Sequence, residues 1–174
     1  MPDDSELSEV LKSEDEIGKV IRTHLYLENI LNNFLETALP NPQHLKPIQL
    51  DFFGKVQLAL CLGLPDKFKK PLNYMGLVRN NFAHKLYIRV GKSEVNNFFD
   101  TFSNEQKEEI INTASMPSLS WVSDGKTWKS IEPSSRFMVM CFALYYGLKI
   151  ALIEFETEKK TSEHLKRIGK YSLE

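Results

Sequence analysis

Three side chains of the sequence, Arg79, Asn80 and His84, combine residue types that suit chemistry at a phosphate group. Arginine offers a planar, permanently charged fork that matches the non-bridging oxygens of a phosphate. Histidine titrates near neutral pH and can act as a general base or a general acid. Asn80 precedes His84 by one helical turn, so its amide could orient the imidazole or contact the phosphate. We therefore take the run from Arg79 to His84 as the candidate catalytic segment.

The helix expected to carry this segment, residues 68–86, gives Arg79 an unusual position. At about 100° per residue, Arg79 falls in the middle of an apolar stripe formed by Leu72, Met75, Phe82, Ala83 and Leu86. A buried arginine is costly unless it is paired and hydrogen-bonded. Glu28 interrupts the apolar face of the helix expected at 17–38 in the same way. We expect the two charges to meet as a partly buried ion pair, which either supports the site or serves the architecture alone.

His84 does not share the helix face of Arg79. An ideal helix separates the two residues by about 140°. Their side chains can converge if the helix ends or unwinds near residue 84, or if the guanidinium reaches round the helix. They can also line one groove together with a symmetry-related chain. The spacing leaves these three arrangements open.

The charges are unevenly distributed, although the net charge is only −1. Residues 67–93 contain no acidic residue and seven basic ones: Lys67, Lys69, Lys70, Arg79, Lys85, Arg89 and Lys92. This asymmetry indicates a local anion-binding surface, with an ordinary solvated helix face as the alternative. Residues 1–13 are rich in acidic side chains and poor in apolar ones, so we expect a mobile N-terminal arm followed by one helical domain at 14–174.

Length and composition favour a single soluble domain. A chain of 174 residues with 42% hydrophobic residues can bury a core of ordinary size. Cys61 and Cys141 both lie in apolar runs, which is typical of small core residues in a reducing compartment and favours the cytoplasm. The N-terminus lacks the basic and apolar stretches of a signal peptide. The longest charge-free apolar run, residues 137–148, is shorter than the roughly 20 residues of a membrane span, so we expect no membrane segment.

Hydrophobic periodicity predicts an all-α fold, an antiparallel bundle of about five main helices. Ser13 and Glu16 resemble a capping box, so the first helix is expected to begin near residue 14. The helices are expected at 14–38, 51–62, 68–86 with Pro71 in its first turn, in shorter pieces within 93–114, and from 133 to about 160. The last helix is apolar on nearly every side from 137 to 148. It is therefore either the centre of the bundle or a helix shared with a second subunit.

One segment, residues 119–131, departs from the helical pattern. Its centre, Asp124-Gly125, is a strong signal for a two-residue β-hairpin turn. Such a turn would place Trp121 opposite Trp128 on one face of a small hairpin. The alternative is an ordered loop with two buried indoles. In either case we expect the tryptophans to serve packing, because they have no neighbouring bases that would form a nucleic-acid platform.

The run from Arg79 to His84 resembles the R-x4-6-H signature of the HEPN superfamily, which comprises small helical domains that often act as metal-independent ribonucleases. A polar residue directly after the arginine, here Asn80, is usual in that family. The upstream segments 26–31, 51–55 and 60–64 also look like relatives of this class. The resemblance covers roughly residues 17–90 and, loosely, the last helix, while residues 93–132 have no counterpart.

This resemblance implies a function. It implies an endoribonuclease, a toxin or defence component, that needs no metal and no cofactor and acts as a homodimer with a composite site. Catalysis would fall to Arg79, Asn80 and His84 with support from Glu28, and RNA would be contacted by Lys70, Lys85 and Arg89. Because one histidine cannot easily act as base and acid at once, the His84 of a second copy would supply the other role. The other histidines show no metal-ligand spacing.

A similar helical architecture occurs in the mannitol operon repressor family, with which the segment 55–64 is also compatible. That resemblance implies a non-catalytic transcriptional regulator or interaction module. An antitoxin or a regulatory protein is the protein partner expected under these interpretations. An unrelated helical interaction protein is the third interpretation.

Overall fold

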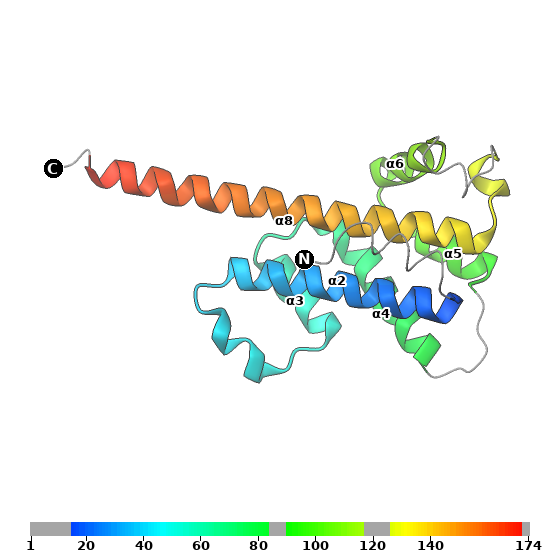
Figure 1. The fold of residues 1–174 in the computed structure, drawn as a ribbon, viewed down its shortest axis with the longest axis horizontal. Coiled ribbons are helices and arrows are strands. Elements are labelled where there is room, and N and C mark those ends of the chain that lie inside the picture. The colour runs from blue at the N-terminus through cyan, green and yellow to red at the C-terminus, as the bar shows by residue number, and fades with distance from the viewer. Residues whose placement is uncertain (1–14, 84–89, 117–125, 172–174) are drawn as a thin grey trace.

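The computed structural model of the chain describes residues 15–83, 90–116 and 126–171. Within these ranges every regular element is helical, which confirms the all-α class (Figure 1). The α-helices are α2 (Glu16–Ala38), α3 (Phe52–Cys61), α4 (Lys69–Ala83), α5 (Lys92–Asp100), α6 (Asn104–Ala114) and α8 (Pro133–Tyr171). Single turns of 3-10 helix lie between them: η1 (Pro42–His44), η2 (Lys46–Ile48), η3 (Asp66–Phe68) and η5 (Trp128–Ser130).

Two aspartates fix the starts of the helices that build the site. Asp15 caps α2, because its Oδ1 accepts a hydrogen bond from the backbone N–H of Gly18 at 2.7 Å. The capping box expected at Ser13 involves a residue outside the described ranges, and the cap that the structure describes is Asp15. Asp51 caps α3 in the same way, accepting from the N–H of Gly54 at 2.8 Å. After α3, Gly63 adopts a φ of 109°, which ends the helix where the sequence predicts.

The core forms where α2, α3 and α4 pack on one another and where α8 lies along α2. The expected direct packing of α2 on α4 is confirmed. The first half of α8 is the central element, because most of its side chains are buried against α2, α5 and α6. Buried α8 residues include Phe137, Val139, Met140, Leu144 and Leu148. Most of the apolar surface of 137–148 is therefore covered within one chain, whereas Tyr146 is 39% exposed.

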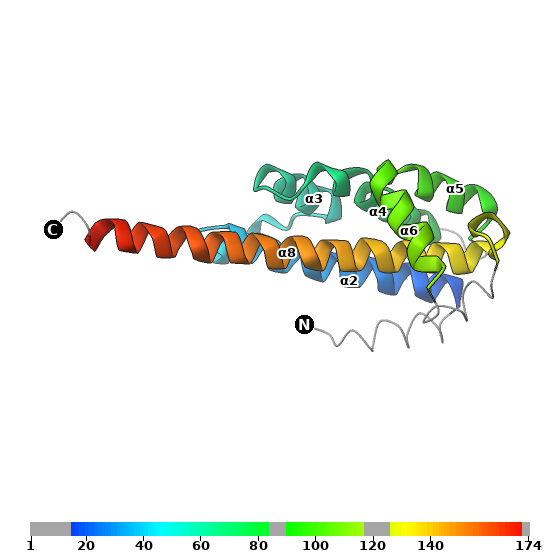
Figure 2. The ribbon, with the colours of Figure 1, turned by 90° about the horizontal axis from the view of Figure 1, so that it is seen from above.

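The directions and lengths of two helices differ from the expectation. α2 and α8 lie side by side and run in the same direction, so this pair departs from a purely antiparallel arrangement (Figures 1 and 2). α8 continues to Tyr171, past the expected end near 160, and its C-terminal part projects beyond the bundle (Figure 1). Apolar side chains on this part, such as Leu165 and Ile168, are exposed.

By length and composition alone, α8 could cross a membrane. However, 61% of its most apolar window is buried inside the protein. The central helix of a bundle has the same composition, because all its faces meet other helices. The packing of α8 thus accounts for its hydropathy, and the helix is weak evidence for a membrane span.

Two expectations about smaller features are wrong in the described part of the chain. Residues 126–131, which would form the second strand of the hairpin, instead contain the 3-10 turn η5. There the ring of Trp128 is buried 5.3 Å from the Phe99 ring and 4.8 Å from the Arg136 guanidinium, as the loop interpretation predicts. Trp121 and the Asp124-Gly125 turn lie outside the described residues. Cys61 is exposed at the end of α3 and is not a core residue, whereas Cys141 is buried; both thiols are free.

Candidate functional site

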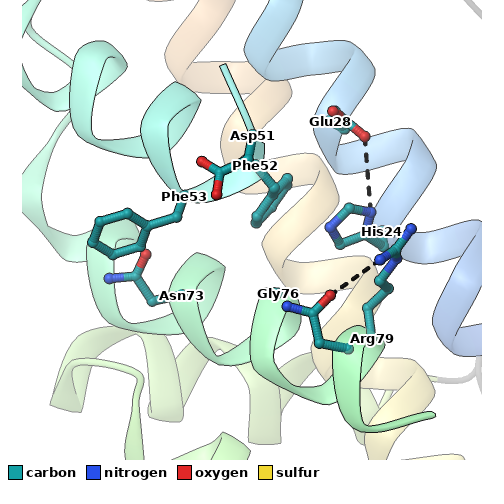
Figure 3. A pocket seen from close by; sticks show the side chains of 9 residues that line it. His24, Glu28, Asp51, Phe52, Phe53, Asn73, Gly76 and Arg79 are labelled. Carbon is teal, nitrogen blue, oxygen red and sulfur yellow. Dashed lines mark hydrogen bonds and ion pairs between the residues drawn. The ribbon is translucent and has the colours of Figure 1, made fainter. Parts of the chain in front are cut away.

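A pocket of about 390 Å³ opens where α2, α3 and α4 meet (Figure 3). α2 provides a histidine and a carboxylate, the start of α3 provides a carboxylate and two phenylalanines, and α4 provides amides and a guanidinium. The lining residues are His24, Glu28, Asp51, Phe52, Phe53, Asn73, Gly76, Arg79 and Asn80. Three of the four residues predicted as catalytic or supporting, Glu28, Arg79 and Asn80, therefore lie in one pocket.

Arg79 is exposed at this pocket, and the expected ion pair with Glu28 is wrong. Its Nη1 donates a hydrogen bond to Oδ1 of Asn80 at 3.0 Å, and no carboxylate of a described residue lies within ion-pair distance. The physical reason is the position of the apolar face of α4. Val78 is buried beside Leu72, Met75 and Phe82, which moves the centre of that face about 45° away from Arg79. The guanidinium therefore lies at the edge of the core, where it is exposed and lines the pocket.

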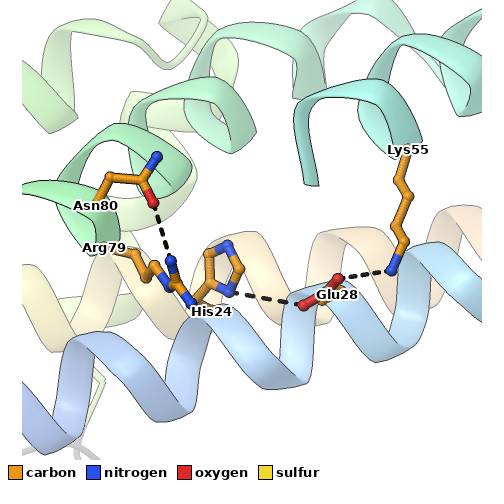
Figure 4. A network of polar contacts seen from close by, with 5 residues as sticks. All are labelled: His24, Glu28, Lys55, Arg79 and Asn80. Carbon is orange, nitrogen blue, oxygen red and sulfur yellow. Dashed lines mark hydrogen bonds and ion pairs between the residues drawn. The ribbon is translucent and has the colours of Figure 1, made fainter. Parts of the chain in front are cut away.

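Glu28 pairs with Lys55 instead, because the first turn of α3 brings that lysine over α2. The Lys55 Nζ donates to Glu28 Oε1 at 2.6 Å, and the side chains of Lys55 and Glu28 are 18% and 26% exposed (Figure 4). This partly buried, charge-assisted contact satisfies the carboxylate that sequence periodicity had placed against the core. Within the part of the chain that the structure describes, Arg79 is thereby left without a carboxylate partner and can bind an anion.

His24 is a titratable site residue that the sequence analysis missed. Its side chain is buried, its ring centroid lies 4.2 Å from that of Phe52, and its Nδ1 is 3.9 Å from Glu28 Oε2. Burial lowers the pKa of His24 below its usual 6.5; Glu28 opposes this shift, while Arg79 and Lys55 add to it. The imidazole is therefore mainly neutral at pH 7. The available signal was its spacing, since His24 lies on the apolar stripe of α2 about one turn before Glu28.

The amides of α4 complete the polar lining. Asn80 and Asn73 lie on the same side of α4, about 20° apart around the helix axis. The Oδ1 of Asn73 is enclosed and has no hydrogen-bond partner among the described residues. Gly76 lies between them, and a Cβ there would meet the Phe52 ring at 3.1 Å. A glycine at this position lets the ring of Phe52 approach both α4 and His24.

Of the remaining predicted site residues, the structure describes only Lys70. His84, Lys85 and Arg89 lie outside the described residues, directly after the last described residue of α4, Ala83. Lys70 is exposed in the first turn of α4 and does not line the pocket. It precedes Arg79 by about 14 Å along the helix axis, at 1.5 Å per residue. Any contact of Lys70 with RNA would therefore fall several nucleotides away from the pocket.

The described residues contain no group of three or more His, Cys, Asp or Glu side chains that could hold a metal ion. The pocket itself combines a fixed positive charge, a neutral imidazole, amides and aromatic rings, which suits acid–base chemistry at an anionic group. No protein-family model, no curated protein and no solved structure matches the chain.

Proposed function

We propose that this chain is a metal-independent endoribonuclease of the HEPN type. The observation that carries the proposal is the state of Arg79. It is exposed at a pocket, and among the described residues its guanidinium is hydrogen-bonded only to the neighbouring Asn80. An arginine kept for architecture would be expected to hold a carboxylate, and Glu28 is bound by Lys55 instead. A free guanidinium beside amide groups suits the non-bridging oxygens of a phosphodiester.

The proposed reaction is internal attack of an RNA 2′-hydroxyl on the adjacent phosphorus. A base removes the 2′ proton as the O2′–P bond forms, the P–O5′ bond breaks, and an acid protonates the leaving O5′. Arg79 and Asn80 stabilise the charge on the non-bridging oxygens in between. His84 takes one of the two proton-transfer roles. The products are a 2′,3′-cyclic phosphate and a free 5′-hydroxyl.

One histidine cannot hold both protonation states at once, so a second proton-transfer group is required. A homodimer would supply it as the His84 of a second copy, with two sites facing one groove. A histidine of the same chain is the other source. Light scattering at micromolar concentration tests the first arrangement, and a monomer that still cleaves RNA would contradict it.

The experiment that tests the proposal is incubation of purified protein with total RNA in EDTA. Wild type is expected to cleave, whereas Arg79→Ala and His84→Ala are expected to be inactive and to keep the helical content of wild type. Arg167→Ala is the matched control, because it removes an exposed arginine of α8 that does not line the pocket. Cleavage that is lost in EDTA, or that survives His84→Ala, contradicts the proposed mechanism.

One observation favours a second candidate, a non-catalytic regulator or interaction module of the mannitol operon repressor type. The C-terminal half of α8 exposes Ile153, Leu165 and Ile168, which are 54%, 62% and 51% exposed. Exposed apolar side chains on a free helix suit protein–protein contact. An antitoxin or a regulatory protein would be the partner. A protein that leaves RNA intact in EDTA and in Mg²⁺ would favour this candidate.

A further inference from the structure

Three side chains from two helices form a chain of polar contacts that ends in the pocket (Figure 4). Lys55 Nζ holds Oε1 of Glu28 at 2.6 Å, and the other carboxylate oxygen of Glu28 lies 3.9 Å from Nδ1 of His24. The distance of 3.9 Å is too long for a hydrogen bond, but catalytic contacts are often long before substrate binds and shorten in the complex. Lys55 thereby fixes the carboxylate that faces the imidazole.

This arrangement selects one tautomer of His24. A carboxylate next to Nδ1 favours the proton on that nitrogen, which leaves Nε2 with a lone pair. In Figure 4 the ring turns Nδ1 toward Glu28, so Nε2 lies on the opposite edge, away from the carboxylate. The ring also packs against Phe52 at an interplanar angle of 40°, which restricts its orientation. His24 is thus a neutral imidazole with an oriented acceptor nitrogen in the pocket that contains Arg79 and Asn80.

The charges around His24 come from all three helices of the pocket. Glu28 lies on the same helix, Lys55 on α3 and Arg79 on α4, while Asp51 lines the same pocket at the start of α3. Glu28 raises the pKa of His24, and Arg79 and Lys55 lower it, so the net change is a lowering caused mainly by burial. An imidazole of this kind accepts a proton at pH 7 and is protonated only in more acidic solution.

We propose that His24 is the general base of the cleavage site and that Glu28 and Lys55 position it; this inference rests on the proposed ribonuclease function. The Nε2 of His24 accepts the proton of the 2′-hydroxyl as O2′ bonds to phosphorus, and His84 donates a proton to the leaving O5′. After product release, His24 returns its proton to solvent and His84 is reprotonated. The described pocket then contains both the general base and the phosphate-binding Arg79.

The test is the pH dependence of single-turnover RNA cleavage by wild type and by variants at His24, His44, Glu28 and Lys55. His24→Gln is expected to lower kcat by about 100-fold or more, the usual contribution of a general base, with RNA affinity unchanged. Added imidazole should partly restore cleavage by His24→Ala, because the deletion leaves a cavity beside Phe52. The matched control is His44→Gln, which changes an exposed histidine outside the pocket.

Substitutions of the two positioning residues, Glu28 and Lys55, should shift the pH profile of cleavage in a way that a purely structural role would not. Glu28→Gln removes the charge that raises the pKa of His24, so the acidic limb of the pH profile should move to lower pH. Lys55→Met removes a charge that lowers this pKa, so the limb should move to higher pH. These opposite shifts remain measurable even if His24→Gln fails to fold, and their absence overturns the role of His24.

The outcomes separate this inference from the function on which it rests. If His84→Ala is inactive while His24→Gln keeps the rate and pH profile of wild type, the ribonuclease function stands and the role of His24 is wrong. If wild type cleaves no RNA, both proposals fail. Loss of cleavage in His24→Gln with imidazole rescue of His24→Ala and opposite shifts in the two positioning variants supports both.

Discussion

Replacing Arg79 with alanine distinguishes the two roles that the sequence allows for this residue, which are a buried ion pair with Glu28 and the binding of a phosphate. An arginine buried against Glu28 would, on removal, strand a charge in the core at a cost of about 3–5 kcal/mol. In the structure Arg79 is exposed, and among the described residues it holds only the Asn80 amide at 3.0 Å. Exposed substitutions away from such networks change stability by about 0.5 kcal/mol or less. Arg79→Ala is therefore expected to unfold with nearly the free energy of wild type.

The assay is urea denaturation followed by circular dichroism, with the slope of the transition compared between variants. Phe82→Ala is the matched control on the same helix, since Phe82 is only 4% exposed and its truncation should cost about 3–5 kcal/mol. An Arg79→Ala variant as unstable as Phe82→Ala would refute the conclusion that the Arg79 side chain contributes little to the free energy of unfolding. Arg79→Ala should also raise the pKa of His24, because Arg79 is one of the charges that lower it.

Three further predictions concern the residues around the pocket. Lys55→Met leaves Glu28 without its ammonium partner and should cost about 1 kcal/mol in the same urea assay, the upper range for a partly exposed ion pair; no loss would show that the 2.6 Å contact contributes nothing. Gly63→Ala forces a side chain into a backbone with φ of 109° and should cost about 1–2 kcal/mol, while the helical Gly147 is not constrained in this way. Because the pKa of His24 is lowered on folding from 6.5, His24 contributes stability that is present above pH 6.5 and is lost as pH falls through the folded-state pKa. His24→Gln should therefore flatten the acid dependence of the melting temperature just below pH 6.5, and an unchanged dependence would contradict burial of a neutral His24.

Local periodicity was sufficient to predict the helices that build the pocket. Val20, Leu27, Leu31 and Leu35 recur on one face of α2 and are all buried, because the spacing of side chains round a helix is fixed by its backbone. The same pattern could not decide whether α8 is covered by its own chain or by a second one. That depends on how α2, α5 and α6 pack, and in the structure they cover most of the first half of α8 within one chain.

The partner of Glu28 could not be predicted in this way. Periodicity places Glu28 and Arg79 correctly on their own helices, but the choice between Arg79 and Lys55 depends on where α3 lies over α2. The segment with η1 and η2 sets that position, and it has no repeat pattern from which a path can be derived. His24 was missed for a related reason. One histidine on an apolar stripe resembles a core residue until Arg79 and Asn80 are brought to the same pocket.

The most direct test of the proposed ribonuclease function uses one labelled RNA oligonucleotide in EDTA and its copy with a 2′-deoxy sugar at the cleaved position. The mechanism predicts that wild type converts the all-ribose strand to a product with a 2′,3′-cyclic phosphate and leaves the modified strand intact at that position. Arg79→Ala and His84→Ala should leave both strands intact. Cleavage of the 2′-deoxy strand at the same position, or a requirement for divalent metal, would contradict attack by the 2′-hydroxyl at this site.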